Sequence, residues 1–493
     1  VSADRYYVVD LSSKRWQAEQ LARRLVAQGI SVGRLTGQTR ICGKDYNDGA
    51  LIVDTAQPAG RLARTLLAKD TLLPEAFIQE QEARRTRGLD WEIYDVTAWS
   101  LPLMSGVEAV SCRRIDTSGI RPVLTDIAPP YETLQTDDAF GYAVPWTDAG
   151  QAKLVLAALQ TGLSAKATDH PFTIAGQTFP RGSVVFTAAA NTPELGAQLD
   201  RLARDIGADI VPLSTGWTDS GPNIGSDSFK PLSFPKIAMA WGLGTRSTDA
   251  GAARYVLEQQ FGLPVAPIRV RSIRRADLAE YDVVILPDTS GFADIAGEAA
   301  AEALADFAAG GGTLIGFADA VDYLANEDVG LLSTVREAAW TDAEPNEEPG
   351  EAIGLAAGTR IRDEDDYEGV IAAQENTPDS VPGVLVTAQA DPDHWLSAGY
   401  DTATALFSGG DIYQPIKADA GTNVFRFAGP DDLLASGYLW DENRQQLAYK
   451  PFVMAEQNGD GWIIGFTESP VTRAYLDGLN LLLLNAVLFG PAH

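Results

Sequence analysis

The stretch that decides the fold reads Tyr281-Asp-Val-Val-Ile-Leu-Pro-Asp288, then an alanine-rich run, then Gly310-Gly-Gly-Thr-Leu-Ile-Gly-Phe-Ala-Asp319. Its continuous apolar runs, Val283–Leu286 and Thr313–Phe317, are typical of strands that are buried on both faces of a parallel sheet. Ala299–Ala309 between them is rich in strong helix formers, and glycines follow where the helix should end. The stretch therefore predicts strand, helix, strand.

The same alternation extends through a domain expected to span residues 235–493. Alternating strands and helices predict a doubly wound parallel sheet with helices on both faces. From about residue 381 the pattern changes to short strands separated by Gly/Asp turns, which predicts added C-terminal strands. The expected elements are Ile237–Trp241, Ala250–Phe261, Val265–Val270, Asp282–Leu286, Val384–Thr387, Val424–Phe427, Trp462–Phe466 and a final helix at Tyr475–Leu488.

The N-terminal part contains an internal repeat of a small α/β unit. Four landmarks recur 133 residues apart: Gly29 and Gly162, Gly49 and Gly182, Leu62 and Leu195, Leu66 and Leu199. Such a common offset indicates duplication. We therefore expect a first unit with its following segment at residues 1–130, and a second unit with a linker at 131–234. The first strands, Tyr6–Val9 and Tyr142–Pro145, need a small gap to align.

Three further segments have interpretable compositions. Trp91–Asp116 is aromatic and poor in charge, which predicts a buried clamp between the two repeats, with a binding loop as the alternative. Ser214–Phe234 is rich in Gly, Ser, Asp and Pro, which is typical of a linker. Thr341–Asp366 is acidic and is expected to be a solvated insertion.

Composition limits the classes of partner. The 493 residues carry 38 basic and 67 acidic side chains, for a net charge of −29. Such a surface repels nucleic acid and anionic lipid, so neither partner is expected. The longest apolar run, Leu479–Phe489, is interrupted by Asn480 and Asn485 and is too short to span a bilayer.

Cys42 and Cys112 are the only cysteines. They fit either one disulfide in an exported protein or two buried thiols, and two cysteines do not make a zinc site. The chain begins at Val1, not Met, so we expect it to be a processed or partial product.

The turn after the strand Thr313–Phe317 reads Gly316-Phe317-Ala318-Asp319-Ala320. Chemistry in an open α/β sheet is expected where such a strand ends. The stretch resembles the class I glutamine amidotransferase-like fold, in which a nucleophile occupies this turn. Here the turn contains neither Cys nor Ser, so the resemblance implies the fold without its nucleophile.

A second resemblance covers nearly the whole chain. Three groups of segments resemble the non-catalytic C-terminal region of large bacterial zinc carboxypeptidase-like proteins of peptidase family M14. They are Tyr94-Asp-Val-Thr-Ala-Trp-Ser-Leu-Pro-Leu-Met-Ser-Gly-Val-Glu108, Leu434-Ala-Ser-Gly-Tyr-Leu-Trp440, and Gly461-Trp-Ile-Ile-Gly-Phe-Thr467 with Leu482-Leu-Leu-Asn-Ala-Val-Leu-Phe-Gly490.

That family binds zinc through His-x-x-Glu and a distant His, with a Glu as general base. This chain has His170, His394 and His493, and none is followed by Glu at the required spacing. No catalytic, cofactor-binding or metal-ligating residue is therefore assigned, and zinc is expected only in a catalytic domain outside this chain.

Several weaker candidates remain. Asp391-Pro-Asp-His394 offers metal-like ligands, but Pro at its second position favours a plain turn. Ser290 is a conceivable displaced nucleophile, although a turn is the simpler interpretation. Asp363–Asp366 lacks the glycine and the ligand spacing of a known calcium loop. Gly242-Leu-Gly244 lacks the third glycine of a dinucleotide-binding loop.

The sequence thus favours a periplasmic or secreted accessory region that braces its own peptidase domain and helps to capture peptide. An amidohydrolase-like or amidotransferase-like enzyme using His394, which follows Ala318 by 76 residues, is one alternative. A scaffold that binds peptide or glycan between the repeats, with Trp91 or Trp99 at the edge of its cleft, is another.

Overall fold

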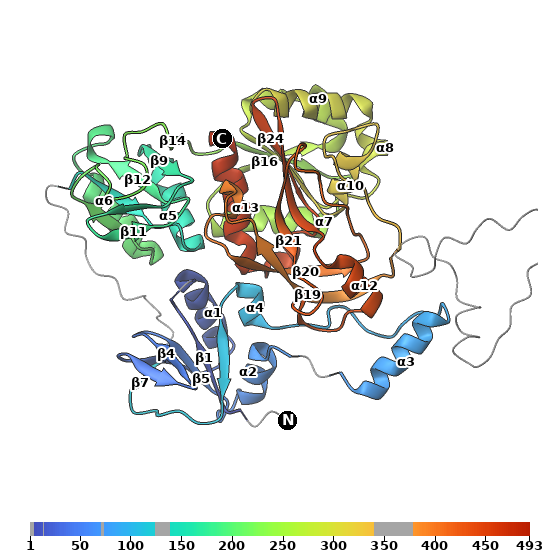
Figure 1. Ribbon diagram of the computed structural model, residues 1–493, viewed down its shortest axis with the longest axis horizontal. Coiled ribbons are helices and arrows are strands. Elements are labelled where there is room, and N and C mark those ends of the chain that lie inside the picture. Colours follow the sequence, from blue (N-terminus) through green and yellow to red (C-terminus); the bar gives the residue numbers. More distant parts are fainter. Residues whose placement is uncertain (1–3, 13, 71–72, 124–138, 340–377) are drawn as a thin grey trace, which may run out of the picture.

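The computed structural model describes residues 4–12, 14–70, 73–123, 139–339 and 378–493. It is a mixed α/β molecule, as the sequence predicts. Figure 1 shows three bodies: a blue N-terminal unit, a green second unit, and a yellow-to-red body built around one long sheet. The predicted boundary near residue 130 lies outside the described residues.

The N-terminal unit is a five-stranded antiparallel sheet with two helices on one face. Tyr7 and Val9 pack against the helices α1 (Arg15–Ala27) and α2 (Gly60–Leu67). Because side chains alternate along a strand, Tyr6 points to the other face, which a hairpin covers. The sheet order is β6 (Ala109–Cys112), β1 (Tyr6–Val9), β5 (Leu51–Asp54), β2 (Val32–Leu35), β7 (Ile120–Val123); the hairpin is β3 (Thr39–Ile41) and β4 (Lys44–Tyr46).

The second unit repeats this topology. Each strand occupies the place of its counterpart, and all pairings are again antiparallel. The order is β13 (Val211–Leu213), β8 (Gly141–Val144), β12 (Val184–Thr187), β9 (Ala165–Thr168), β14 (Phe229–Leu232), with helices α5 (Ala149–Gln160) and α6 (Leu195–Ile206) and hairpin β10 (Phe172–Ile174) and β11 (Gln177–Phe179). Strand β14 lies inside the segment predicted to be a linker, so that prediction was wrong in part.

The offset of 133 residues holds from β2 to β5, since β2 begins at 32 and β9 at 165 (165 − 32 = 133). Even the hairpin turns match, with positive φ angles of 49° and 50° at Cys42 and Ala175. The leucine pairs do not match. A short helix, η1 (Ala188–Ala190), lengthens the second unit before α6, so Leu62 is 41% exposed whereas Leu195 is 2% exposed. The pair Leu66 and Leu199 fails for the same reason.

The segment Trp91–Asp116 clamps the first unit to the large body, and not to the second unit as predicted. Its C-terminal part is strand β6 of the first sheet. Upstream, the Thr97 amide donates to the Gly383 carbonyl at 2.8 Å. The short helix α4 (Leu101–Ser105) ends at Gly106, where an added Cβ would lie 3.0 Å from the Gly478 Cα. This close backbone contact needs glycine on both sides. Helix α3 (Glu75–Thr86) precedes the segment.

The large body is a ten-stranded mixed sheet. Its first half is parallel, and its second half is antiparallel, which confirms a parallel-sheet domain with added strands. The last strand of the chain, β24, completes the parallel half beside β18. The order is β16 (Val265–Arg269), β15 (Ile237–Trp241), β17 (Val283–Leu286), β18 (Thr313–Phe317), β24 (Gly461–Phe466), β23 (Pro451–Asn458), β21 (Thr422–Phe427), β19 (Val381–Ala390), β20 (Thr402–Gly409), with β22 (Leu434–Ser436) paired to β19.

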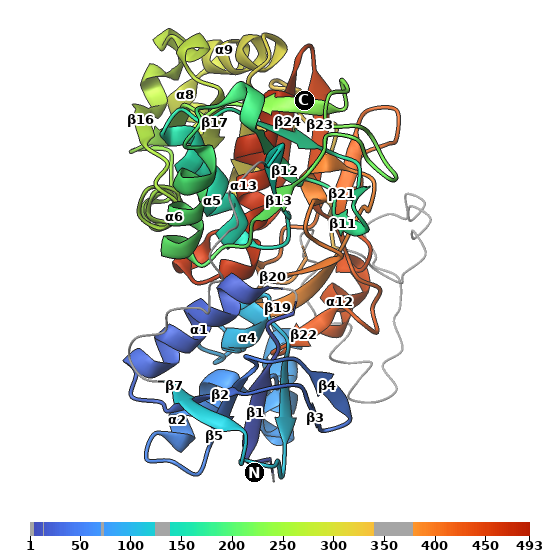
Figure 2. The ribbon, with the colours of Figure 1, turned by 90° about the vertical axis from the view of Figure 1, so that its left-hand side faces the viewer.

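Helices cover both faces of the parallel half, which explains its continuous apolar strands. Ile285 and Ile315 face one layer, whereas Val284 and Leu314 face the other. The first layer contains α7 (Ser247–Arg254), its π-helical continuation η2 (Tyr255–Gln260) and α13 (Asn480–Phe489); the second contains α8 (Phe292–Ala296), α9 (Glu298–Ala309) and α10 (Asp319–Ala325), while α12 (Asp441–Leu447) lies near β19 and β20 (Figures 1 and 2).

Polar side chains join the three bodies at a point that we call the junction: the half-buried Lys14 and the buried Trp146, Asp148, Tyr400 and Asn485. Helix α13 lies between α5 and the sheet, and its Asn485 accepts a hydrogen bond from the Trp146 indole at 2.8 Å. The Asn485 amide donates to two backbone carbonyls at 2.8 Å. Asn485, one of the two asparagines that interrupt the apolar run, is thus a structural residue.

The remaining junction groups are also paired. Lys14 donates to two backbone carbonyls, at 2.9 and 2.6 Å, and its ammonium lies over the Tyr400 ring. Asp148 accepts from the Trp16 and Gly150 amides. Within the described ranges, no helix is both long and apolar enough to cross a bilayer.

Candidate functional site

The turn after β18 has the strained backbone expected of a nucleophile-bearing elbow. Ala318 adopts φ 48° and ψ −120°, a conformation that L-residues rarely take, and α10 begins at the next residue. Its amide donates to the Phe466 carbonyl at 2.8 Å, which fixes the turn against β24. The side chain at the apex is a methyl group, so the elbow offers no nucleophile.

Charged side chains surround this turn at the carboxyl ends of the parallel strands. Arg246, after β15, contacts Asp288, after β17, at 2.9 Å and Asp319, after β18, at 2.9 Å. We call this region the elbow edge. Its residues come from loops that the sheet brings together because parallel strands end on the same side.

A second charged group adjoins the first. Asp411, beyond β20, forms an ion pair with Arg336 and lies against Asp319. A bridge between Arg336 and Tyr413 holds the two segments together. The Tyr413 side chain is 1% exposed, whereas Asp322, which also acts on Asp411, is exposed.

Burial raises the pKa of several carboxyl groups at the elbow edge. The pKa of Asp288 rises to about 6, with Arg246 opposing the shift. Burial also raises the pKa of Asp411 and Asp249, and it raises that of Glu468 well above its usual range. Asp249 accepts a hydrogen bond from the Ser469 hydroxyl. Raised acid pKa values in one place are typical of functional sites.

Three buried polar atoms here have no hydrogen-bond partner among the described residues: Asp288 Oδ1, the Tyr323 hydroxyl and the Tyr413 hydroxyl. An unpaired buried polar group costs about 1–3 kcal/mol. Sequence reasoning missed these residues. The sequence nevertheless contains a signal for a charged site at this edge of the sheet. An acidic residue follows each of β17, β18 and β24 within two residues, at Asp288, Asp319 and Glu468.

His394 is not near the elbow. Its ring lies 5.9 Å from that of Trp462, which pairs with Thr313 at the amino end of β18. Ala318 follows the carboxyl end of the same strand, so the length of the strand, roughly 13 Å, separates the two. The expected placement of His394 beside the turn was therefore wrong. Burial lowers the pKa of His394 to about 4, which keeps the imidazole neutral.

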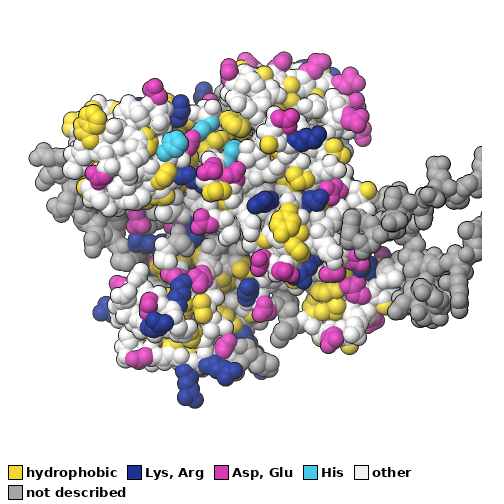
Figure 3. All heavy atoms as spheres, in the orientation of Figure 1, with side chains coloured by type: hydrophobic (Ala, Val, Ile, Leu, Met, Phe, Trp, Pro, Cys, Tyr) yellow, Lys and Arg dark blue, Asp and Glu magenta, His cyan; other side chains and the backbone are white. Residues whose placement is uncertain are grey.

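The Asp391-Pro-Asp-His394 cluster is a turn, as the proline predicts. The Asp393 amide donates to Asp391 at 2.9 Å, and His394 Nδ1 accepts from the Leu396 amide. His493 stacks on Trp395 and contacts Asp169 at 2.8 Å. Figure 3 shows histidine side chains gathered where the second unit meets the large body. These groups pack the two bodies together.

The other candidates are dispersed. Ser290 is exposed in the turn after β17, and its amide bonds to the Gly244 carbonyl. His170 is exposed. Asp363–Asp366 lies outside the described residues. In the described part of the chain, no group of three or more His, Cys, Asp or Glu is arranged to hold a metal ion.

The repeats enclose a polar cleft of about 720 Å³, lined by Arg15, Arg34, Gln177 and Asp209 among others. Trp91 and Trp99 do not line it. Trp99, which belongs to the clamp segment Trp91–Asp116, is 42% exposed and packs beside Tyr475 of the large body.

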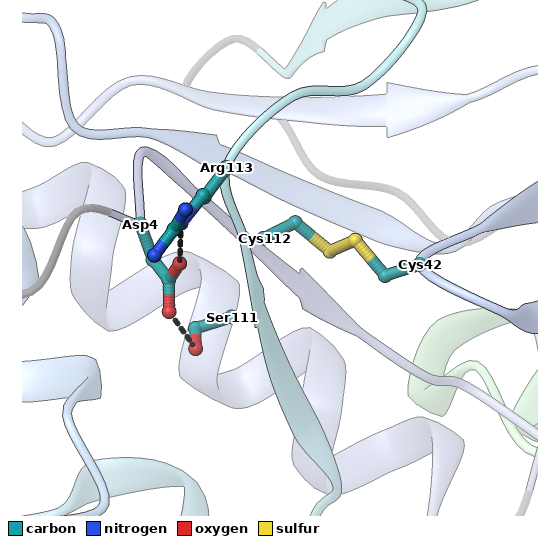
Figure 4. Close-up of a disulfide and its surroundings, with 5 residues drawn as sticks. All are labelled: Asp4, Cys42, Ser111, Cys112 and Arg113. Carbon is teal, nitrogen blue, oxygen red and sulfur yellow. Dashed lines mark hydrogen bonds and ion pairs between the residues drawn. A yellow bond between two sulfur atoms is a disulfide. The ribbon is translucent and has the colours of Figure 1, made fainter.

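Cys42 and Cys112 form a disulfide that ties the β3–β4 turn to β6, beside the Asp4 contacts to Ser111 and Arg113 (Figure 4). The equivalent hairpin of the second unit has Ala175 at the position of Cys42. It is held instead by Phe172, which stacks on Phe179 and meets Phe229 edge-on. The same hairpin is thus secured by two different means.

No protein-family model matches the chain, and no curated protein matches it. Among solved structures, it is similar to a ThuA-like protein from Parabacteroides merdae, with 11% identity and TM-score 0.32 over 52% of this chain and 90% of that one. A glutamine amidotransferase from Thermotoga maritima shows 9% identity and TM-score 0.31 over 51% and 98%. A β-galactosidase from Bacillus circulans shows 16% identity and TM-score 0.27 over 60% and 34%. Similarity this low assigns no function.

Proposed function

We propose that this chain is a non-catalytic accessory region of a zinc carboxypeptidase-like protein of the M14 type, with an amidotransferase-like domain that has lost its chemistry. The observation that carries the proposal is Ala318. The turn keeps the strained conformation that presents a nucleophile, but it presents a methyl group. The three segments that resemble this family supply the link to a peptidase.

In this role the chain braces and orients its own peptidase domain and helps to capture peptide. Zinc would belong to that domain. We propose a periplasmic or secreted location, and the Cys42–Cys112 disulfide favours it, because disulfides persist in oxidising compartments.

The alternative of an amidohydrolase that uses His394 has no geometric support, since His394 lies at the opposite end of the sheet from Ala318. A scaffold that binds peptide or glycan is favoured by one observation, the cleft of about 720 Å³ between the repeats. That scaffold role is compatible with an accessory region and gives it a surface for substrate.

The test is metal analysis and enzymology on the purified full chain. We expect substoichiometric zinc and no release of C-terminal residues from peptides or of ammonia from glutamine. The matched control is Ala318→Ser, which places a hydroxyl at the elbow without a nearby imidazole and is expected to stay inactive. One equivalent of zinc together with peptidase turnover would refute the proposal.

A second test reads the gene upstream of the codon for Val1. The proposal expects a coding region joined to this chain that contains His-x-x-Glu and a distant His. An upstream region without these residues would remove the link to a peptidase while leaving the non-catalytic elbow intact.

A further inference from the structure

The Tyr413 hydroxyl is the least expected polar group of the elbow edge. Its side chain is 1% exposed and its oxygen has no hydrogen-bond partner within the described residues. A phenylalanine would fill the same space without the cost of an unpaired hydroxyl, about 1–3 kcal/mol. A buried hydroxyl without a partner therefore points to a group that the site receives from outside.

The groups around this hydroxyl carry an excess of negative charge. The Tyr413 hydroxyl interacts electrostatically with four charged side chains, those of Asp411, Asp322, Arg336 and Asp319. Among the groups that act on Tyr413, the carboxyl groups outnumber the guanidinium groups by three to one: Asp319, Asp322 and Asp411 against Arg336.

Both guanidinium groups are already engaged. Arg246 contacts Asp288 and Asp319, and Arg336 pairs with Asp411. Asp288 Oδ1 remains an unpaired acceptor. The free hydrogen-bonding capacity is thus an acceptor oxygen and a phenol, in a negative field, and an anionic ligand would find no free cation among the described residues of this edge.

The edge is also open to solvent on one side. The Arg246 and Arg336 side chains are 51% and 40% exposed, and Asp322 is exposed at the rim. A ligand can therefore reach the rim of the edge at Asp411, and contact with the buried Tyr413 hydroxyl requires the Arg336–Asp411 ion pair to open.

The chemistry distinguishes among cations. The described residues place no three ligands for a metal ion together. A primary ammonium needs less, since its three donors can be shared among separate carboxylates and a phenol oxygen. A neutral sugar would supply donors but would not offset the excess charge.

We propose that the elbow edge binds a primary ammonium group at the contact of the Asp411 and Asp319 carboxylates, with the Tyr413 hydroxyl as its third partner. The ammonium is carried by a peptide, either on a lysine side chain or at an amino terminus. The site goes beyond the accessory role and does not depend on it, because it rests only on the residues of the large body.

The experiment titrates the full chain at pH 7.5 with amine probes, followed by saturation-transfer NMR. The probes are n-butylamine, Nα-acetyl-lysine amide for the side-chain source, and glycyl-glycine amide for the terminal source. The neutral control is n-butanol, and calcium chloride is a separate arm. We expect saturable amine binding at least about tenfold tighter than that of n-butanol, a ratio that corresponds to about 1.4 kcal/mol. Whichever of the two peptide probes binds more tightly identifies the source of the ammonium group, a lysine side chain or an amino terminus.

Two variants localise the site. Tyr413→Phe removes one hydrogen bond to a charged group and should weaken amine binding about five- to tenfold, and Asp411→Asn should weaken it at least as much. The matched controls are Tyr449→Phe and Asp431→Asn, at exposed positions outside the elbow edge, which should bind within about twofold of the wild type.

Thermal unfolding checks that each variant is folded. Tyr413→Phe deletes an unpaired oxygen and should melt at or above the wild-type temperature, so it decides the question even where Asp411→Asn is unstable. The proposal is overturned by amine binding no tighter than that of n-butanol, by wild-type affinity in Tyr413→Phe, or by calcium binding that displaces the amine. Loss of the accessory role alone would leave these results unchanged.

Discussion

The junction and the elbow edge differ in whether their buried polar groups have hydrogen-bond partners. At the junction, Lys14, Trp146 and Asn485 all have hydrogen-bond partners across the three bodies. At the elbow edge, the Tyr413 hydroxyl and Asp288 Oδ1 have none in the described part of the chain. Stability alone explains the first arrangement, because satisfied polar networks hold elements in one geometry. It does not explain the second, which we attribute to ligand binding.

The largest effect is expected at the junction. Asn485→Ala would leave the Trp146 indole and two backbone carbonyls without partners in a fully buried position. We expect a loss of roughly 2–4 kcal/mol of unfolding free energy, measured by chemical denaturation. Asn47→Ala, at an exposed asparagine, is the control and should change stability little. Equal stability of the two variants would show that the junction is not the structural centre.

The second effect is a pH dependence of the junction. Burial lowers the pKa of Lys14 to about 8, while Asp148 and Asp401 raise it. Between about pH 8 and 10.5 the unfolded chain therefore holds more protons than the folded chain at this site, so stability rises with pH. We expect the free energy of unfolding to rise by roughly 2 kcal/mol between pH 8 and pH 9.5, an interval that lies below the pH at which tyrosines titrate.

Lys14→Met is the control for this titration, because it keeps the length of the side chain and removes the charge. Its stability should lack the rise between pH 8 and 9.5. A wild-type curve that is flat or falling over the same interval would contradict the assignment of Lys14 as a buried, partly desolvated ammonium.

A smaller effect tests the strained elbow. Ala318→Gly relieves the backbone strain at φ 48° but makes the unfolded chain more flexible, so we expect a net gain of up to about 1 kcal/mol. Ala320→Gly, two residues on in α10, should lose about 1 kcal/mol because its position is helical and buried. Losses of the same size in both variants would show that Ala318 is not strained.

The sequence predicted most of the fold because its signals are local. The apolar runs Val283–Leu286 and Thr313–Phe317 became central strands, and the predicted first strands of the two repeats, Tyr6–Val9 and Tyr142–Pro145, fall within one residue of β1 and β8. Predictions that needed tertiary knowledge were less successful. Leu62 was paired with Leu195 by offset alone, although a short helix before α6 shifts the register of the second copy.

The site was harder to predict for a physical reason. The turn at Ala318 was located correctly because it follows a buried strand, but His394 was misplaced because its distance along the chain does not fix the end of the sheet at which it lies. The importance of Tyr413 depends on the absence of a hydrogen-bond partner, which only three-dimensional contacts reveal.

The most direct test compares two buried tyrosines. The Tyr400 hydroxyl, at the junction, donates to the Gly478 carbonyl at 2.7 Å and accepts from the Leu482 amide at 3.0 Å. The Tyr413 hydroxyl has no hydrogen-bond partner among the residues that the structure describes. Calorimetric unfolding of the ligand-free Tyr400→Phe and Tyr413→Phe chains should show a loss of about 1–2 kcal/mol for the first and no loss for the second. A loss of equal size at Tyr413 would mean that its hydroxyl already has a structural partner, and would contradict the account of the elbow edge as a ligand-binding site.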